Sequence, residues 1–208
     1  MLVDDALGLG GAQLATMVRT EVADAGRVAD QVASTAAPAA SGYVRIVVGK
    51  TCSRCIILAG RVYRWSQGFE RHPNCDCQML PVAAARAAGF VQSPQRVYAS
   101  MTAEERSAAG WSKAEQAAIA AGADISAVTN IHRKGALHTA GGLRLTREST
   151  TRRGLYGGYV VDQQTGQLRR RRPGEKAVGR LTPESIYRLA GDDRDLAVRL
   201  LRRFGYLR

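Results

Sequence analysis

Four cysteines and one histidine form two short clusters with the composition of a metal site. Two residues separate Cys52 from Cys55, and the second cluster contains His72, Cys75 and Cys77. These are all the cysteines of the chain, and sixteen residues lie between Cys55 and His72. Zinc prefers thiolate and imidazole ligands, and a CxxC turn followed by a second cluster after roughly 15–20 residues closes a tetrahedral site. The spacing predicts a structural Zn²⁺ ion.

Five candidate ligands compete for four positions, so the sequence leaves the ligand set open. Cys52 and Cys55 pair with two of His72, Cys75 and Cys77. His72 with Cys75 repeats the two-residue gap, whereas Cys75 with Cys77 puts two thiolates on one side of a strand. The fifth residue would then support the ligands by hydrogen bonding.

Other chemistries fit the same residues less well. Disulfides are disfavoured because the N-terminus carries Asp4 and Asp5 where a secretion signal would be basic. A redox CxxC needs a thioredoxin-like βαβ pattern, which does not surround Cys52. A catalytic zinc site would keep one position open, but the donors here suffice to close it.

Short strands are expected around the cysteines. Residues 43–48, 61–65 and 78–82 are rich in β-branched, aromatic or apolar side chains, which predicts a small β unit. Residues 12–34 before it have the apolar spacing of an amphipathic helix, and residues 34–42 read as a linker. That helix packs either on its own domain or on a partner; the pattern does not decide.

Helical signals return after the β unit. Thr102 and Ser112 each precede a glutamate by three residues, the pattern of a capping box. Near the end, Thr182 followed by proline predicts a helix start, and a last helix from about Asp192 carries an apolar face of Leu196, Leu200 and Phe204.

Positive charge is concentrated toward the C-terminus. The chain has a formal charge of +12, and residues 144–208 carry +9 of it. We predict that an arginine group binds either packaged DNA, without sequence preference, or a neighbouring protein subunit. Its members are Arg152, Arg153, Arg169, Arg170, Arg171 and Arg172.

The predicted fold class is α+β. It combines a small zinc-knuckle β unit with flanking helices, an N-terminal helix and an extended basic C-terminal arm. The expected segments are an N-terminal helix and linker (1–40), a zinc-knuckle core with following helices (41–135), a Gly/Arg-rich extended arm (136–180) and a C-terminal helical hairpin (181–208). No apolar stretch has the length of a membrane span, so we expect no membrane partner.

The residues around the cysteines resemble the zinc knuckle of phage Mu F-like minor head proteins, in the form found in phages of actinobacteria. The resemblance rests on CSRCIILAGRVYRW and GFERHPNCDCQMLPV, and extends less sharply over residues 43–208. It implies a virion protein made in the host cytoplasm, a portal or capsid partner and a part in head assembly or DNA delivery. Only about 40 residues precede the knuckle here, fewer than is usual in that family.

Two other functions are alternatives to the virion role. The first is a zinc-containing nucleic-acid-binding protein outside the virion. The second is a capsid maturation protease, for which His132 and His138 are the remaining histidines, although neither lies in a GxSxG context. The leading interpretation is therefore a structural protein and not an enzyme.

Overall fold

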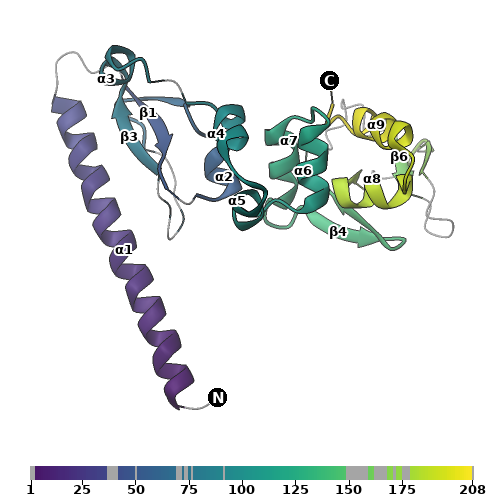
Figure 1. Ribbon diagram of the computed structural model, residues 1–208, viewed down its shortest axis with the longest axis horizontal. Helices are drawn as coiled ribbons and strands as arrows, with labels where there is room; N and C mark the ends of the chain where they lie inside the picture. Colours follow the sequence, from purple (N-terminus) through teal and green to yellow (C-terminus); the bar gives the residue numbers. More distant parts are fainter. Residues whose placement is uncertain are drawn as a thin grey trace. The chain divides into compact units, whose positions relative to one another are not determined.

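Figure 1 shows the computed structural model of the chain. It describes residues 3–36, 42–49, 51–68, 72, 75, 77–90, 92–148, 159–161, 168–170, 172–174 and 179–207. The chain divides into two compact units, Met1–Ala109 and Gly110–Arg208. Both contain helices and small antiparallel sheets, so the predicted α+β class is confirmed.

The first unit begins with the helix α1 (Val3–Ala36), which is 34 residues long. It starts nine residues earlier than the spacing of its apolar residues predicts. Gly8, Gly10 and Gly11 lie inside it, and each costs about 1 kcal/mol relative to alanine without preventing a helix. Asp4 and Asp5 in the first turn offset part of this cost by interacting favourably with the helix dipole.

A three-stranded antiparallel sheet forms the centre of the first unit. Its strands are β1 (Gly42–Val47), β2 (Val62–Arg64) and β3 (Cys77–Pro81), in the order β2-β1-β3. Tyr43, Arg45 and Val47 alternate along β1 and are all buried, so they define its inner face. These strands lie where the sequence predicts the β unit.

Four short helices complete this unit. They are α2 (Ser53–Ile56), α3 (Val82–Ala87), α4 (Pro94–Ser100) and α5 (Ala103–Ala108). Gln92, just before α4, fixes the end of β1 by accepting from the Val47 N–H and donating to its carbonyl, at 2.8 and 3.0 Å. Gly60 has a φ of +77°, and a Cβ there would lie 1.9 Å from the Gln92 carbonyl oxygen. Only glycine fits at this position.

The second unit contains the helices α6 (Lys113–Ala120), α7 (Ile125–Thr129), α8 (Pro183–Ala190) and α9 (Arg194–Arg203), with the 3₁₀ turn η1 (Asn130–His132). Its strands are β4 (Leu137–Ala140), β5 (Leu143–Thr146), β6 (Tyr159–Val161), β7 (Leu168–Arg170) and β8 (Arg180–Leu181). The predicted capping boxes are present at Thr102 in α5 and at Ser112 in α6.

In the segment 136–180, which the sequence predicts as an extended arm, the described residues take part in two sheets. One has the order β4-β5-β8, and the other pairs β6 with β7. Leu143 and Leu145 of β5 are buried, with the exposed Arg144 between them. This alternation lies among many glycines and arginines, which dilute the apolar pattern of the segment and hide the strands from sequence analysis.

The core of the second unit gathers around α8 and α9. Ile186 and Leu201 are fully buried there, Phe204 is 1 % exposed, and the Tyr206 hydroxyl donates to the Leu181 carbonyl at 2.8 Å. The predicted inward face of the last helix is confirmed for Leu200 and Phe204; Leu196 is half-buried.

Replacing Phe204 with alanine should lower the unfolding free energy of the second unit by about 3 kcal/mol, because the deletion leaves a cavity in a closed core. Chemical denaturation followed by Trp111 fluorescence measures this, since that indole is 1 % exposed in the same unit. Leu189→Ala is the control, because Leu189 is 39 % exposed and should change the free energy far less. Equal effects of the two substitutions would contradict the assigned core.

A buried carboxylate pairs with a histidine in the second unit. Glu115 is fully buried, and its Oε1 lies 2.6 Å from His132 Nε2 while Oε2 accepts the Ser112 N–H at 2.7 Å. The hydrogen bond with Glu115 raises the pKa of His132 above its ordinary value, although burial opposes the shift. Ser112 Oγ donates to Glu184 at 2.6 Å and also caps α6, so this serine has a structural role.

The raised pKa of His132 predicts a pH-dependent contribution to stability. A histidine whose pKa is higher in the folded state stabilises fully below its unfolded pKa of about 6.5, and the gain disappears as pH rises through the folded pKa. His132→Gln should therefore lose more stability relative to the native chain at about pH 6 than at about pH 9. Denaturation of both proteins at the two pH values measures the difference. A gap that is independent of pH would refute the ion pair.

Candidate metal centre

The end of β1 and the start of β3 bring the two cysteine clusters together. Cys77 opens β3 and pairs in register with Val47, the last residue of β1. The chain then turns from β1 into α2, whose N-cap residue is Cys52. The sheet therefore positions the second cluster beside the first, as the zinc-knuckle pattern requires.

The helix α2 supplies the CxxC turn. The Cys52 carbonyl accepts the backbone N–H groups of Cys55 and Ile56 at 3.0 and 3.1 Å, which curls the chain so that both thiols face one side. The Ser53 N–H donates to the Ala109 carbonyl at 2.8 Å and ties this turn to the residue after α5. The turn is thus held by the rest of the first unit.

The donor atoms lie at distances that suit a single ion. Cys52 Sγ and Cys55 Sγ lie 3.1 and 3.4 Å from His72 Nε2, and Cys55 Sγ lies 3.4 Å from Cys75 Sγ. Zn–S and Zn–N bonds of about 2.3 and 2.0 Å place tetrahedral ligands roughly 3.5–3.8 Å apart. The cluster could therefore hold a metal ion.

Two overlapping groups of three donors make up the cluster. Cys52, Cys55 and His72 form one, and Cys55, Cys75 and Cys77 form the other, with all atoms within each group no more than 4.8 Å apart. Cys55 belongs to both groups and is the central donor. The structure brings together all five candidates from the sequence without selecting four.

The buried side of the cluster is closed and carries a positive charge. Arg45 is 2 % exposed, and its Nη2 donates to Cys77, Cys55 and Cys75 Sγ at 3.3, 3.5 and 3.9 Å. Burial alone would lower the pKa of Arg45, but the hydrogen bond and charge of Cys77 outweigh it and raise the pKa above its usual value. A fixed cation at this distance stabilises the thiolates that a metal ion requires.

Sequence analysis missed Arg45, although a signal for it exists. It occupies the middle of the apolar alternation of β1, between Tyr43 and Val47. Arginine on the inner face of a strand needs a buried partner, since an unpaired charge is costly there. Four cysteines close by in the sequence were the available partners.

The thiols differ strongly in acidity. The hydrogen bond with Cys55, together with the charge and the hydrogen bond of His72, lowers the pKa of Cys52 to about 5, although burial opposes the shift. The same bond to Cys52, together with contacts to Cys75 and Cys77, raises the pKa of Cys55 well above its usual range. The hydrogen bond with Cys55 opposes it, but the hydrogen bond with Cys75 and burial raise the pKa of Cys77 as well. In the absence of a metal, Cys52 therefore ionises before Cys55 and Cys77.

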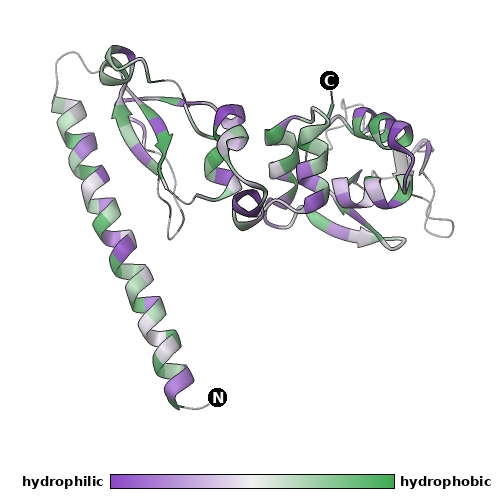
Figure 2. Ribbon diagram, in the orientation of Figure 1, coloured by the Kyte–Doolittle hydropathy of each residue, from purple (hydrophilic) through white to green (hydrophobic). Residues whose placement is uncertain are grey.

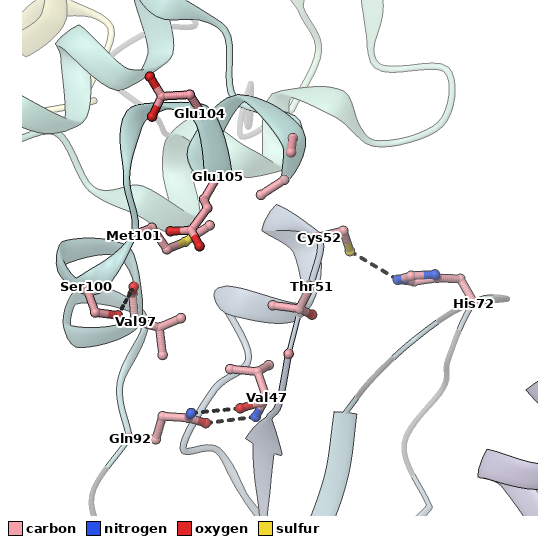
Figure 3. Close-up of a pocket in the computed structure, with 13 residues that line it drawn as sticks. Val47, Thr51, Cys52, His72, Gln92, Val97, Ser100, Met101, Glu104 and Glu105 are labelled. Carbon is pink, nitrogen blue, oxygen red and sulfur yellow. Dashed lines mark hydrogen bonds between the residues drawn. The ribbon is translucent and has the colours of Figure 1, made fainter. Parts of the chain in front are cut away.

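A cavity of about 950 Å³ adjoins the exposed side of the cluster. Cys52 and His72 line it, together with residues of β1, α4 and α5 such as Val47, Val97 and Glu105 (Figure 3). Cys55, Cys75 and Cys77 are buried away from solvent. Among the five residues of the cluster, Cys52 and His72 are therefore the ones that solvent reaches.

The arginines predicted to bind DNA or a partner belong to the second unit. Arg169 and Arg170 lie in β7, where they pair with Val160 and Tyr159 of β6. Arg172 is also described, whereas Arg152, Arg153 and Arg171 lie outside the described residues. Neighbouring residues of a strand point to opposite faces, so Arg169 and Arg170 cannot both face one flat surface.

Comparison with known proteins places the chain among phage-encoded proteins. A family model described as "VG15 protein" matches residues 5–130, more than half of the chain, so the chain belongs to the VG15 protein family. The match covers α1 except its first two residues, and all five residues of the cysteine and histidine cluster. No curated protein and no solved structure matches the chain. In the described part of the chain, no helix is both long and apolar enough to cross a bilayer.

Proposed function

We propose that the protein is a structural, non-enzymatic minor capsid protein of a tailed phage, stabilised by one Zn²⁺ ion. Its membership of a phage protein family supports the viral setting. The resemblance of the cysteine and histidine segment to the Mu F-like minor head proteins supports the more specific role. On this proposal the protein is part of the virion and contacts the portal, the major capsid protein or both.

The observation that carries the structural role is the closure of the metal centre on its inner side. Three of the four thiols are buried, and Arg45 occupies the space behind them. A catalytic zinc site keeps a position open for water or substrate, whereas a structural site is closed by protein ligands. The two overlapping groups of three donors share Cys55, and together they offer more donors than the four that closure of a structural site needs.

The metal would add a direct link between the two cysteine clusters, which the pairing of β1 with β3 and the hydrogen bond from Ser53 to Ala109 already bring together. α2 has a single turn, and Cys75 lies outside any helix or strand. Binding one ion to both clusters fixes α2 against β3, and such a site can supply much of the folding energy of a small domain. A stable, compact β unit is what a component of a densely packed particle needs.

Mass spectrometry of purified phage particles tests the virion role. We expect peptides of this chain in intact particles after nuclease and protease treatment, at a constant ratio to the portal protein. A chain confined to the infected-cell lysate would favour the alternative of a nucleic-acid-binding protein outside the virion. Loss of capsid-protein processing in a His132→Ala phage would instead favour the protease.

A further inference from the structure

The cavity of about 950 Å³ beside the cysteine and histidine cluster lies entirely within the first unit. Residues of α4 and α5 line one part of it, and the end of β1, the turn before α2 and His72 line the rest. Pockets that bind ligands usually hold about 300–1,000 Å³, so this one is at the upper end of the range. It has room for a long side chain and for part of the backbone that carries it.

The buried part of this cavity is apolar. Val47 at the end of β1 is 8 % exposed, and Val97 of α4 and Met101 after it are half-buried. Figure 2 shows both hydrophobic and hydrophilic residues along α4 and α5. Apolar surface next to polar groups suits a long side chain that has a methylene stem and a charged end.

The polar side chains that line the cavity offer negative charge and hydrogen-bond acceptors. Glu104 and Glu105 in the first turn of α5 are both exposed, and no lysine or arginine is among the described residues that line the cavity. The Ser100 hydroxyl donates to a carbonyl of α4 at 2.8 Å, so its lone pairs remain to accept. The amide of Gln92 is occupied by the backbone of β1. The lining is therefore complementary to a cation that carries several N–H donors.

The carboxylate of Glu105 is held in a fixed position. Its Oε2 accepts the Thr102 N–H at 2.8 Å in the capping box, and Thr102 Oγ1 accepts the Glu105 N–H at 3.2 Å. Its Oε1 makes no hydrogen bond within the described part of the chain. A carboxylate that is already fixed loses little side-chain freedom when it binds a ligand.

A hydroxyl elsewhere in the lining is buried without a partner. Thr51 Oγ1 is closed off from solvent and makes no hydrogen bond within the described part of the chain. Buried polar atoms are nearly always paired in folded proteins, so this hydroxyl calls for a polar group from outside the described chain. Thr51 and Glu105 come from different segments around the cavity (Figure 3). A single ligand between them would meet an acceptor on each.

We propose that this cavity binds an arginine side chain of a partner protein. The methylene stem would lie on Val97 and Met101, and the guanidinium group would donate to Glu105 and Thr51. A guanidinium is planar and has five N–H donors, so it can bond acceptors from two segments at once. It is also more weakly hydrated than the ammonium of lysine, and therefore loses less on leaving water. The exposed Glu104 adds attraction for the incoming positive charge.

Calorimetric titration of the full chain, supplied with Zn²⁺, tests the site with the capped pentapeptide Gly-Ala-Arg-Ala-Gly. We expect a dissociation constant of roughly 1 mM or below. The same peptide with citrulline in place of arginine should bind at least about 10-fold more weakly, because citrulline has nearly the same shape but no charge to pair with Glu105. Equal binding of the two peptides, or no binding of the arginine peptide below roughly 10 mM, would overturn the proposal.

Single variants assign the binding to this cavity. Glu105→Gln preserves the capping box of α5 and removes the charge, so it should fold and bind the arginine peptide about 10-fold more weakly. Glu21→Gln is the matched control, because it removes the same charge from an exposed residue of α1 that does not line the cavity, and affinity should not change. Thr51→Val exchanges the hydroxyl for a methyl group and should weaken binding about 3-fold. Equal affinities of the Glu105 and Glu21 variants would place the peptide on another acidic surface and reject the site.

Discussion

Removing the metal, or replacing Cys55 with serine, should unfold the three-stranded sheet of the first unit while the second unit stays folded. Cys55 belongs to both groups of donors, so its loss leaves neither group complete. Structural zinc sites bind with apparent free energies of about 10–16 kcal/mol, which equals or exceeds the roughly 5–15 kcal/mol stability of a typical domain. The loss should therefore exceed what the small sheet can tolerate.

Amide hydrogen exchange measures the loss of structure separately in the two units. The backbone amides of β1 and β3 should lose protection in zinc-depleted protein or in Cys55→Ser, while those of α8 and α9 should keep it. Trp111 fluorescence provides a second check, because this indole is buried in the second unit and donates to Thr129 Oγ1 at 3.0 Å. Metal-free protein with unchanged protection in β1 would refute a structural metal centre.

Single substitutions of the second cluster then identify the ligands. Binding of Co²⁺ reports the number of thiolates through its charge-transfer absorption, and serine at a non-ligand position should leave that spectrum unchanged. Cys77→Ser and His72→Ala are the informative pair, because Cys77 is buried against Arg45 and His72 is exposed at the cavity. A spectrum altered by one and not by the other assigns the fourth ligand.

The cluster of possible metal ligands could be predicted from the sequence because its signal is local. Two residues between Cys52 and Cys55, and a second cluster at a fixed distance, depend little on tertiary structure. Arg45 could not be recognised in the same way, since its role follows from strand β1 crossing behind the thiols. That contact depends on the pairing of β1 with β3, which no short motif encodes.

The longer helices and strands show the same difference between local features, which the sequence predicts, and distant contacts, which it does not. The amphipathic spacing identified the body of α1, but its glycines concealed the first turns, because propensity is a weak guide when the cost is about 1 kcal/mol per residue. The capping boxes at Thr102 and Ser112 were correct since each is completed within four residues. The pairing of β5 with β8 joins residues 145 and 181, and only the folded chain reveals so distant a contact.

Changing Arg169, Arg170, Arg171 and Arg172 to serine should weaken binding to duplex DNA and flatten its dependence on salt. Each phosphate contact contributes a slope of about −0.9 in the plot of log affinity against log salt. The loss of all four contacts would flatten the slope by three to four units. Arg169 and Arg170 extend from opposite faces of β7, so if only one of them reaches the phosphates the change is smaller by about 0.9 units.

The single variants Arg169→Ser and Arg170→Ser decide between these cases, because the two side chains extend from opposite faces of β7. A contact through one face predicts that one variant flattens the slope by about 0.9 and the other leaves it unchanged. Filter binding to duplexes of unrelated sequence, over a salt series, measures both and should show no sequence preference.

If the arginine group binds a neighbouring subunit instead of DNA, the fourfold change should impair particle assembly and leave DNA binding nearly unchanged. DNA affinity would be weak and nearly unaffected by the fourfold change, while particle assembly would fail as guanidinium groups lose their carboxylate or carbonyl partners. The same mutant, introduced into the phage and examined for filled heads, supplies that measurement. Normal assembly together with an unaltered salt slope would reject both roles, because neither phosphates nor a subunit would then depend on these charges.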